Sequence, residues 1–222
     1  MITLSPRLKA AVSMACGADK IIDVGCDHGY LSCYMVTEGG ASFAYACDVN
    51  EGPLAKAKET VYQFDVQDRV TTILSDGLKE LDEDAADTIF ICGMGGELIA
   101  EILKAAPWTV KGAHRLILQP MTKIEKLREF LFLNGYRIEQ ERIVKEDFRF
   151  YCVMSVVGGR GDCGESNMYL FSESVIKDEI FYEYAEYLKN RYKTIASERI
   201  KAGYSADYET SVIKVLEVYN AC

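Results

Sequence analysis

The chain has few of the features that mark secreted or membrane proteins. Although 49% of its 222 residues are hydrophobic, no uninterrupted apolar run reaches the roughly 18 residues that a membrane-spanning helix needs. The N-terminal stretch MITLSPRLKAAVSMACGADK lacks a long apolar segment and a convincing cleavage site. We therefore expect no signal peptide, no membrane partner and a cytoplasmic protein.

Histidine is scarce, and the cysteine spacing argues against metal binding. The chain has two histidines, neither at zinc-site spacing from a cysteine, and none of its eight cysteines forms a CxxC pair. Several cysteines lie inside apolar segments, where a free cysteine behaves as a small hydrophobic residue. We expect no metal, and reduced, buried thiols at Cys16, Cys26, Cys33, Cys47, Cys92, Cys152, Cys163 and Cys222.

Positive charge is also in short supply. Lysine and arginine number 25 against 34 aspartates and glutamates, which gives a net charge of −9 and disfavours a large non-specific nucleic-acid surface. Between residues 111 and 151 the balance reverses, with nine basic against six acidic residues. This segment permits an RNA partner and is equally compatible with an ordinary solvated surface.

Strand-like and helical patterns alternate from residue 5 to about residue 157. Strands are expected at 20–24, 43–49, 70–75, 87–92 and 114–119, and helices at 5–16, 28–38, 52–64, 96–103 and 123–134. The runs RIEQERIVKED and RFYCVMSVVG are expected to form an antiparallel pair of long strands. This order predicts an α/β fold of the doubly wound, Rossmann-like class, with an antiparallel edge strand.

A glycine-rich break then divides the chain. Four glycines fall within the seven residues from Gly158 to Gly164. The ranges 166–202 and 206–221 have the apolar spacing of two amphipathic helices around a turn at Gly203. We expect an α/β domain over 1–157, a linker over 158–165 and a helical hairpin, similar to a short coiled coil, over 166–222.

The stretch IIDVGCDHGYL places two aspartates, two glycines and a histidine where the first strand meets the next helix. In a doubly wound sheet, ligands lie beyond the carboxyl ends of the strands, and glycine lets the backbone approach them. The G-x-G-x-x-G pattern of dinucleotide sites is absent, and Asp23 and Asp27 would repel a diphosphate. S-adenosylmethionine suits these acids better, because it carries an ammonium and a sulfonium group.

Three further strand ends fit the same cofactor. Asp48 ends the second strand, 23 residues after Gly25, where a carboxylate can accept hydrogen bonds from both ribose hydroxyls. Asp76-Gly77 ends the third strand, near the place of the adenine amine. Gly93-Met94-Gly95-Gly96 ends the fourth and leaves open space where the methyl group would leave. One acidic strand end alone can be a plain helix cap, but four suitable ends in order are specific.

These motifs resemble the bacterial tRNA (adenine22-N1)-methyltransferase family, a class I group that uses S-adenosylmethionine. The resemblance runs through LSPRL, DVGCDHGYL, ACDVNEGPL, LSDGL, FICGMGGELI, RLILQP and LFLNGYRIEQERIVKEDFRFY, and covers about residues 4–155. It implies a tRNA substrate and a coiled-coil appendage, whose exposed Lys189, Arg191, Lys193, Arg199 and Lys201 could contact RNA. We also expect a monomer.

Carried over residue by residue, the family's functional positions fall into two groups. Cofactor binding is implied for Asp23, Gly25, Asp27, His28, Tyr30, Leu31, Asp48, Val49, Asn50, Asp76, Gly77, Gly93, Met94, Gly95 and Gly96, and proximity to the substrate for Arg7, Gln119 and Pro120. Two positions depart from the family. Met121 stands where asparagine is usual, which puts a polar contact there in question, and Ser32 stands where proline is frequent.

The acceptor atom follows from what the fourth strand lacks. The [DN]-P-P-[YF] motif that holds an exocyclic amine for N6 methylation is absent. Adenine N1 has a free lone pair at neutral pH, so its methylation needs alignment and charge stabilisation more than a strong base. Asp27 is the expected catalytic residue, with a helix cap or a contact to the cofactor ammonium as alternatives. His28 is expected to position Asp27 or the cofactor, and not to act as a base.

Two other functions fit part of this pattern. A class I methyltransferase of a small molecule or a protein would use the same cofactor motifs and would suit the acidic charge. A non-catalytic binding protein on the same scaffold would keep the fold without transferring a methyl group.

Overall fold

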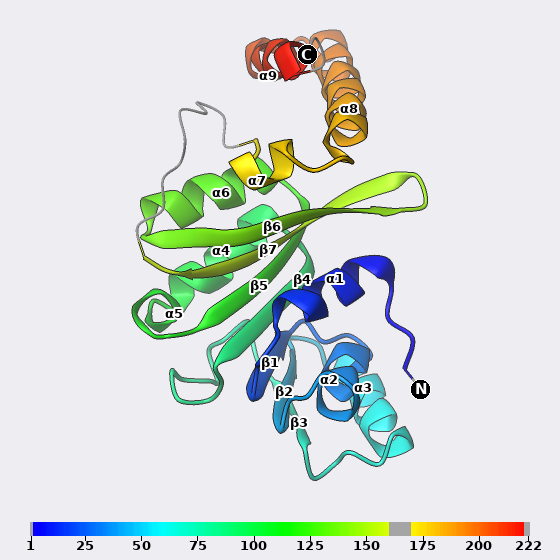
Figure 1. Cartoon of the computed structure of the whole chain (residues 1–222), viewed down its shortest axis with the longest axis vertical. Coiled ribbons are helices and arrows are strands. Elements are labelled where there is room, and N and C mark those ends of the chain that lie inside the picture. Colours follow the sequence, from blue (N-terminus) through cyan, green and yellow to red (C-terminus); the bar gives the residue numbers. More distant parts are fainter. Residues whose placement is uncertain (1, 160–169, 220–222) are drawn as a thin grey trace.

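The computed structural model describes residues 2–159 and 170–219 and contains a seven-stranded sheet with helices on both faces (Figure 1). The strand order is β3-β2-β1-β4-β5-β7-β6. The first five strands in that order run parallel, and β7 is antiparallel to both β5 and β6. The strands are β1 (Lys20–Val24), β2 (Phe43–Asp48), β3 (Val70–Leu74), β4 (Thr88–Gly95), β5 (Arg115–Thr122), β6 (Tyr136–Glu146) and β7 (Arg149–Gly158). The predicted doubly wound sheet with an antiparallel edge pair is confirmed.

Side chains that alternate along the central strands explain why both faces carry helices. In β4, Ile89 and Ile91 lie in one buried cluster and Phe90 lies in the other. In β5, Leu116 and Ile117 divide in the same way. The Phe90 face is covered by α1 (Pro6–Met14), α2 (Tyr30–Thr37) and α3 (Glu51–Gln63), and the Ile89 face by α4 (Gly96–Ala105), α5 (Trp108–Lys111) and α6 (Ile124–Leu133) (Figure 1).

The carboxyl ends of β4 and β5 run further than the sequence pattern predicts. β4 continues to Gly95 instead of ending at 92, and β5 continues to Thr122 instead of 119. The added residues pair through register shifts on either side of Met94, which is a bulged arrangement. Glycine and proline are depleted in strands, so their presence in these segments led the sequence pattern to end both strands too early. The short helix α5 was likewise not predicted.

The described cysteines are free and mostly buried. Cys26, Cys33, Cys47 and Cys152 are buried, Cys92 is partly buried and Cys16 is exposed, while Cys163 and Cys222 lie outside the described residues. Burial raises the pKa of the Cys33 thiol to about 11, so this thiol stays protonated and unreactive near neutral pH. Within residues 2–159 and 170–219, no helix is long and apolar enough to cross a membrane.

The predicted continuous helix over 166–202 is wrong in its first part. Residues 166–169 lie outside the described range, and the next residues form the short helix α7 (Glu173–Ile176) and a turn before α8 (Phe181–Lys201) begins. At that turn, Asp178 accepts a hydrogen bond from the Ile180 N–H through Oδ1 (3.1 Å) and one from the Phe181 N–H through its carbonyl (2.9 Å). The helix α9 (Asp207–Tyr219) then packs antiparallel to α8, as expected for a hairpin.

The residues around α7 sit on a buried polar cluster of the α/β domain. Arg128 on α6 forms an ion pair with Glu141 on β6, and both side chains are at most 5% exposed. Glu141 also accepts hydrogen bonds from Cys152 Sγ (2.6 Å) and from Ser172 Oγ (2.5 Å). The segment that contains Ser172 therefore shields an ion pair that would otherwise meet water.

We propose that the α/β domain extends to about residue 179, beyond the expected boundary at 157. Leu170, Phe171 and Val175 are buried in the same core as β4 and β5. A chain ending at Glu179 is expected to melt cooperatively, whereas one ending at Val157 should be less stable, because burying such a side chain contributes about 1.5–3 kcal/mol. Denaturant unfolding of both chains measures the difference. Equal stability would return the boundary to 157, and an unfolded 1–179 chain would contradict a separable hairpin.

Candidate active site

The carboxyl ends of β3, β2, β1 and β4 meet at one edge of the sheet, and the predicted site residues follow them. Val24 at the end of β1 pairs with Cys47 on β2 and with Ile91 on β4. Asp48 at the end of β2 pairs with Leu74 on β3. The structure therefore brings the four predicted strand ends into one row, with the β1 turn near its middle.

The turn after β1 lies close against both neighbouring strands. The N–H groups of Gly25 and Cys26 both donate to the Cys47 carbonyl at 2.8 Å. Gly25 has a φ of 72°, and a Cβ placed on it would lie 2.2 Å from Met94 Cε. Glycine is favoured here, because the left-handed backbone strains any other residue and a Cβ would also require the end of the Met94 side chain to move.

Asp23 lies beneath this turn and is almost fully buried. Its Oδ2 accepts a hydrogen bond from Ser32 Oγ at 2.8 Å, which joins β1 to α2. Burial raises the Asp23 pKa to about 6, against the lowering effect of the Ser32 hydrogen bonds. Ser32, the departure from the family pattern, thus supplies a hydrogen bond that proline cannot make.

Asp27 and His28 occupy the outer part of the turn. Asp27 has a φ of 49°, its side chain is 73% exposed, and its Oδ1 lies 3.6 Å from His28 Nε2. The His28 ring stacks on Tyr30, with centroids 5.9 Å apart. Gly29 precedes α2, and within the described structure no side chain caps this helix. The carboxylate of Asp27 is therefore free to face a ligand instead of serving as a helix cap.

Asp48 connects the first two turns of the site. Its side chain is nearly buried, with Oδ1 accepting from the Asn50 N–H (2.9 Å) and Oδ2 from the Asp27 N–H (3.4 Å). Val49 beside it is 58% exposed. The carboxylate and the exposed Val49 thus offer a polar and an apolar contact side by side.

The third strand end is more open. Asp76 pairs with Lys79 at 2.5 Å, and both side chains are exposed. Gly77 has a φ of 65°, and its carbonyl accepts a hydrogen bond from Ser75 Oγ at 2.9 Å. A Cβ on Gly77 would lie 3.1 Å from Ile102, so this glycine allows the loop to pack on α4.

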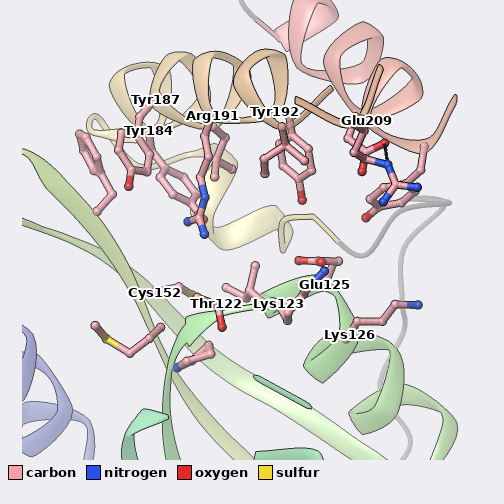
Figure 2. Close-up of a pocket in the computed structure, with 18 of the residues that line it drawn as sticks. Thr122, Lys123, Glu125, Lys126, Cys152, Tyr184, Tyr187, Arg191, Tyr192 and Glu209 are labelled. Carbon is pink, nitrogen blue, oxygen red and sulfur yellow. Dashed lines mark ion pairs between the residues drawn. The ribbon is translucent and has the colours of Figure 1, made fainter. Parts of the chain in front are cut away.

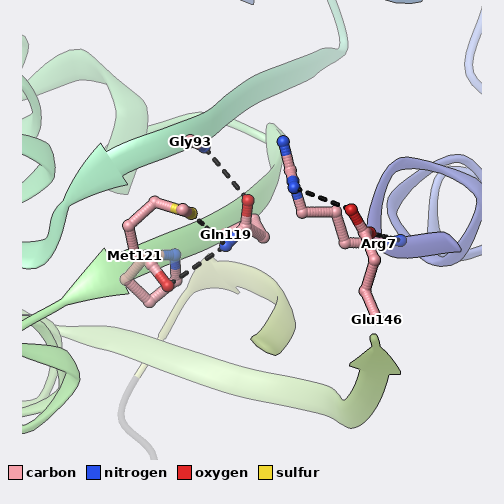
Figure 3. Close-up of polar contacts among 6 residues, drawn as sticks. Arg7, Gly93, Gln119, Met121 and Glu146 are labelled. Atoms are coloured by element: carbon pink, nitrogen blue, oxygen red, sulfur yellow. Dashed lines mark hydrogen bonds and ion pairs between the residues drawn. The ribbon is translucent and has the colours of Figure 1, made fainter. Parts of the chain in front are cut away.

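The fourth strand end is held by a side chain of β5 (Figure 3). Gln119 accepts a hydrogen bond from the Gly93 N–H through Oε1 (3.2 Å) and donates through Nε2 to the Pro120 carbonyl (3.1 Å). The same Nε2 donates a hydrogen bond to Met121 Sδ at 3.5 Å. The methionine sulfur therefore makes a polar contact at the position where the family usually has asparagine. Gln119 has no exposed surface, so it acts through Gly93 and Pro120 and does not contact a ligand directly.

Arg7 reaches this side of the site from α1. Its Nη1 lies 3.1 Å from Glu146 Oε1, its backbone N–H donates to Oε2, and its guanidinium lies 5.2 Å from the centre of the Tyr151 ring. Figure 3 shows the guanidinium extending from α1 towards the ends of β4 and β5. Arg7 therefore forms an ion pair, and the part of its side chain that remains exposed can still meet a substrate.

Comparisons with known proteins agree with this arrangement. The family described as "Methyltransferase domain" matches residues 4–154. The tRNA (adenine(22)-N(1))-methyltransferase of Bacillus subtilis (strain 168) is 36% identical over 161 residues, which make up 72% of this chain and 68% of that protein. The chain belongs to the tRNA (adenine(22)-N(1))-methyltransferase family.

Solved structures extend the likeness to the whole chain. A Streptococcus pneumoniae protein solved with S-adenosyl-L-methionine is 28% identical, with a TM-score of 0.86, and the match covers 98% of this chain and 100% of that one. TrmK of M. capricolum, solved with S-adenosyl-homocysteine, is 28% identical, with a TM-score of 0.78 and coverage of 97% and 99%. The resemblance to the tRNA (adenine(22)-N(1))-methyltransferase family that the motifs predicted is confirmed.

Not every position taken from the family pattern lies where a ligand could touch it. Leu31 lies on the buried side of α2, and Gln119 is buried on β5 beside the end of β4. Conversely, no sequence pattern indicates Glu146, because it is 139 residues from its partner Arg7. In the described part of the chain, no group of three or more His, Cys, Asp or Glu side chains is placed to hold a metal ion.

Proposed function

We propose that this member of the tRNA (adenine(22)-N(1))-methyltransferase family transfers a methyl group from S-adenosylmethionine to N1 of adenine 22 in tRNA. The observation that carries the proposal is the acidic, glycine-lined row of strand ends. Asp23, Asp27 and Asp48 surround the Gly25 turn, and among the described residues none of the three is paired with lysine or arginine. Such a site attracts a cationic ligand and repels a diphosphate.

The residues of this edge fit the parts of the cofactor one by one. Asp48 would accept the ribose hydroxyls, with exposed Val49 against the adenine face. Asp76 would meet the adenine amine. Asp27, with His28 beside it, would face the ammonium end or the reacting methyl, and Gly93, which has open space where a side chain would stand, would lie at the point of transfer.

Bound S-adenosylmethionine supplies a methyl group on a positively charged sulfur. The lone pair of adenine N1 would attack the methyl carbon, so that an N–C bond forms as the C–S bond breaks, the bond's electron pair stays on sulfur in a neutral thioether, and the positive charge passes to the adenine ring. Because no proton leaves N1 before the attack, the protein needs no base at this step. The Asp27 carboxylate would stabilise the charge that develops on the ring, and the fixed Gly93 loop would hold the ring in line with the methyl.

The proposal is tested by analysing the nucleosides of tRNA after reaction. The full chain is incubated with labelled S-adenosylmethionine and an unmodified tRNA that has adenine at position 22, and in parallel with the same tRNA carrying guanine there. We expect 1-methyladenosine from the first and no labelled nucleoside from the second. Recovery of N6-methyladenosine would contradict the acceptor atom. Labelling of a protein or small molecule but not of tRNA would favour the other methyltransferase function, and no transfer to any acceptor would favour a binding protein.

Two finer features complete the proposal. A tRNA substrate and protonated, buried thiols such as Cys33 are consistent with work in the cytoplasm. We also propose that the chain acts as a monomer, since one chain supplies every strand end of the site. Light scattering of the purified protein at working concentration would reveal a dimer if this is wrong.

A further inference from the structure

A cleft of about 660 Å³ separates the helical hairpin from the α/β domain (Figure 2). Its lower wall is the end of β5 and the first turn of α6, from Pro120 to Lys126. Its upper wall is one side of α8 together with the start of α9. Figure 2 shows Tyr184, Tyr187, Arg191 and Tyr192 of α8 facing Thr122 and Lys123 across this space. The strand ends proposed to bind the cofactor do not line this cleft, and neither do Arg7 and its partner Glu146.

The cleft is continuous with the proposed transfer site. Gly95 at the end of β4 pairs with Thr122 at the end of β5. A Cβ on Gly96 would lie 2.4 Å from the Lys123 carbonyl oxygen, so the two backbones are in direct contact. Lys123 itself has a φ of 55°, so the chain turns sharply from β5 into α6 at this point. A polymer whose reacting base lies at Gly93 would therefore enter the cleft with its neighbouring residues.

The charge of the cleft suits a polyanion better than the rest of the chain does. The chain as a whole has a net charge of −9. The lining of the cleft, in contrast, contains four basic residues, Lys123, Lys126, Arg191 and Arg199, and three acidic residues, Glu125, Asp207 and Glu209. Lys126 is paired with Glu129 (3.0 Å) and Arg199 with Glu209 (3.6 Å). Lys123 and Arg191 have no carboxylate partner among the described residues, so one unpaired cation stands on each wall.

Aromatic rings lie beside these cations. The rings of Phe150 and Tyr187 are both partly buried and meet with centroids 5.1 Å apart, and Tyr208 at the other end of the cleft is 45% exposed. Unstacked RNA bases bind to aromatic rings, and phosphates bind to lysine and arginine. The lining thus offers both kinds of contact that a single RNA strand needs.

We propose that this cleft holds the RNA next to the methylated adenine, with Lys123 and Arg191 contacting phosphates from opposite walls. The inference rests on the proposed function and adds the path of the substrate between the domain and the hairpin. It also predicts different roles for two basic residues of α8, because Arg191 lines the cleft and Lys193 does not. RNA gripped by the outer face of the hairpin would use Lys193 and spare Arg191.

The test compares Lys123→Gln, Arg191→Gln and the double variant with Lys193→Gln as a matched control on α8. Glutamine keeps a long unbranched side chain, so the left-handed backbone at 123 is no more strained than before. Binding of tRNA is measured by fluorescence anisotropy over a range of salt concentrations, and cofactor binding by calorimetry. Each cleft variant should bind tRNA about fivefold to tenfold more weakly, with the slope of log Kd against log salt reduced by about one. Cofactor affinity should not change, and Lys193→Gln should behave as the unaltered chain.

The outcomes separate this inference from the proposed function. If the unaltered chain methylates tRNA and the cleft variants bind it with unaltered affinity and salt slope, the cleft proposal is wrong and the function stands. Equal weakening by Lys193→Gln would also overturn it, because the effect would then reflect overall hairpin charge. If the unaltered chain binds and methylates no tRNA, both proposals fail. Photocrosslinking from 4-thiouridine placed beside adenine 22 should label peptides of α8, and labelling confined to α1 to α3 would overturn the proposed path.

Discussion

Replacing Gly25 with alanine is expected to weaken S-adenosylmethionine binding about 100-fold while leaving the fold intact. The new Cβ would lie 2.2 Å from Met94 Cε, so the methionine must move, and the methyl group would also stand where the turn approaches the cofactor. Met94 Cε is the end of a flexible side chain and can shift, so the loss of affinity comes from the methyl group at the place where the turn approaches the cofactor, where a steric cost of about 1–3 kcal/mol in the complex corresponds to a change of up to about 100-fold in Kd. Calorimetric titration with S-adenosylmethionine measures the loss.

Gly40→Ala is the matched control for this substitution. Gly40 also has a left-handed backbone, with a φ of 86°, but no atom lies within 4 Å of the place of its Cβ. Both alanine variants should therefore lose about 1–2 kcal/mol of unfolding free energy from the backbone alone. Only Gly25→Ala should lose cofactor affinity. If it bound the cofactor within fivefold of the unaltered chain, the Gly25 turn would not be the place where the cofactor approaches most closely.

Asp27→Asn is expected to slow methyl transfer by about 100-fold to 1,000-fold without abolishing it. Asparagine tolerates the left-handed conformation as well as aspartate does, so the change removes charge and little else at a φ of 49°. Losing one oriented electrostatic group commonly costs a factor of this size. Single-turnover rates at saturating cofactor separate the chemical step from binding. His28→Ala should also slow the step without abolishing it, because it removes the side chain beside the carboxylate.

Asp147→Asn serves as the control, because Asp147 is exposed, lies in the β6–β7 turn and has a φ of 57°. Its rate should match that of the unaltered chain. A complete loss of activity in Asp27→Asn, with cofactor affinity unchanged, would mean that Asp27 does essential chemistry beyond charge stabilisation. An unchanged rate would remove Asp27 from the transfer step altogether.

Local patterns predicted the parts of this protein that depend on neighbouring residues. The strands β1 to β5 have apolar runs bounded by turn residues, and the site residues directly follow those runs. For that reason the sequence alone predicts that Asp23, Gly25, Asp48 and Gly93 lie at one edge of the sheet. Strand–helix alternation predicts the doubly wound class but not the strand order, which the structure gives as β3-β2-β1-β4-β5-β7-β6.

Features that depend on distant pairs were not predictable in the same way. Glu141 on β6 pairs with Arg128 on α6 and accepts a hydrogen bond from Ser172 just before α7, and a periodic pattern of apolar residues does not predict any of these contacts. The same contacts explain why the helical spacing of apolar residues wrongly predicted a continuous helix through residues 170–180. Leu170 and Phe171 are apolar because they pack against the α/β domain, and not only because they face α9. Tertiary packing overrode the local pattern at that point.

The amide of Gln119 has a mechanical consequence for the enzyme. Its oxygen holds Gly93 and its nitrogen holds Pro120 and Met121, so both ends are engaged and a flipped amide would lose these contacts. The β5 residues that it holds line the near end of the cleft, and the glycine that it holds is the one that we propose lies at the point of transfer. Gln119 therefore connects the proposed RNA cleft to the proposed transfer site through one buried side chain, and we expect a displacement of Met121 by bound RNA to shift Gly93 as well.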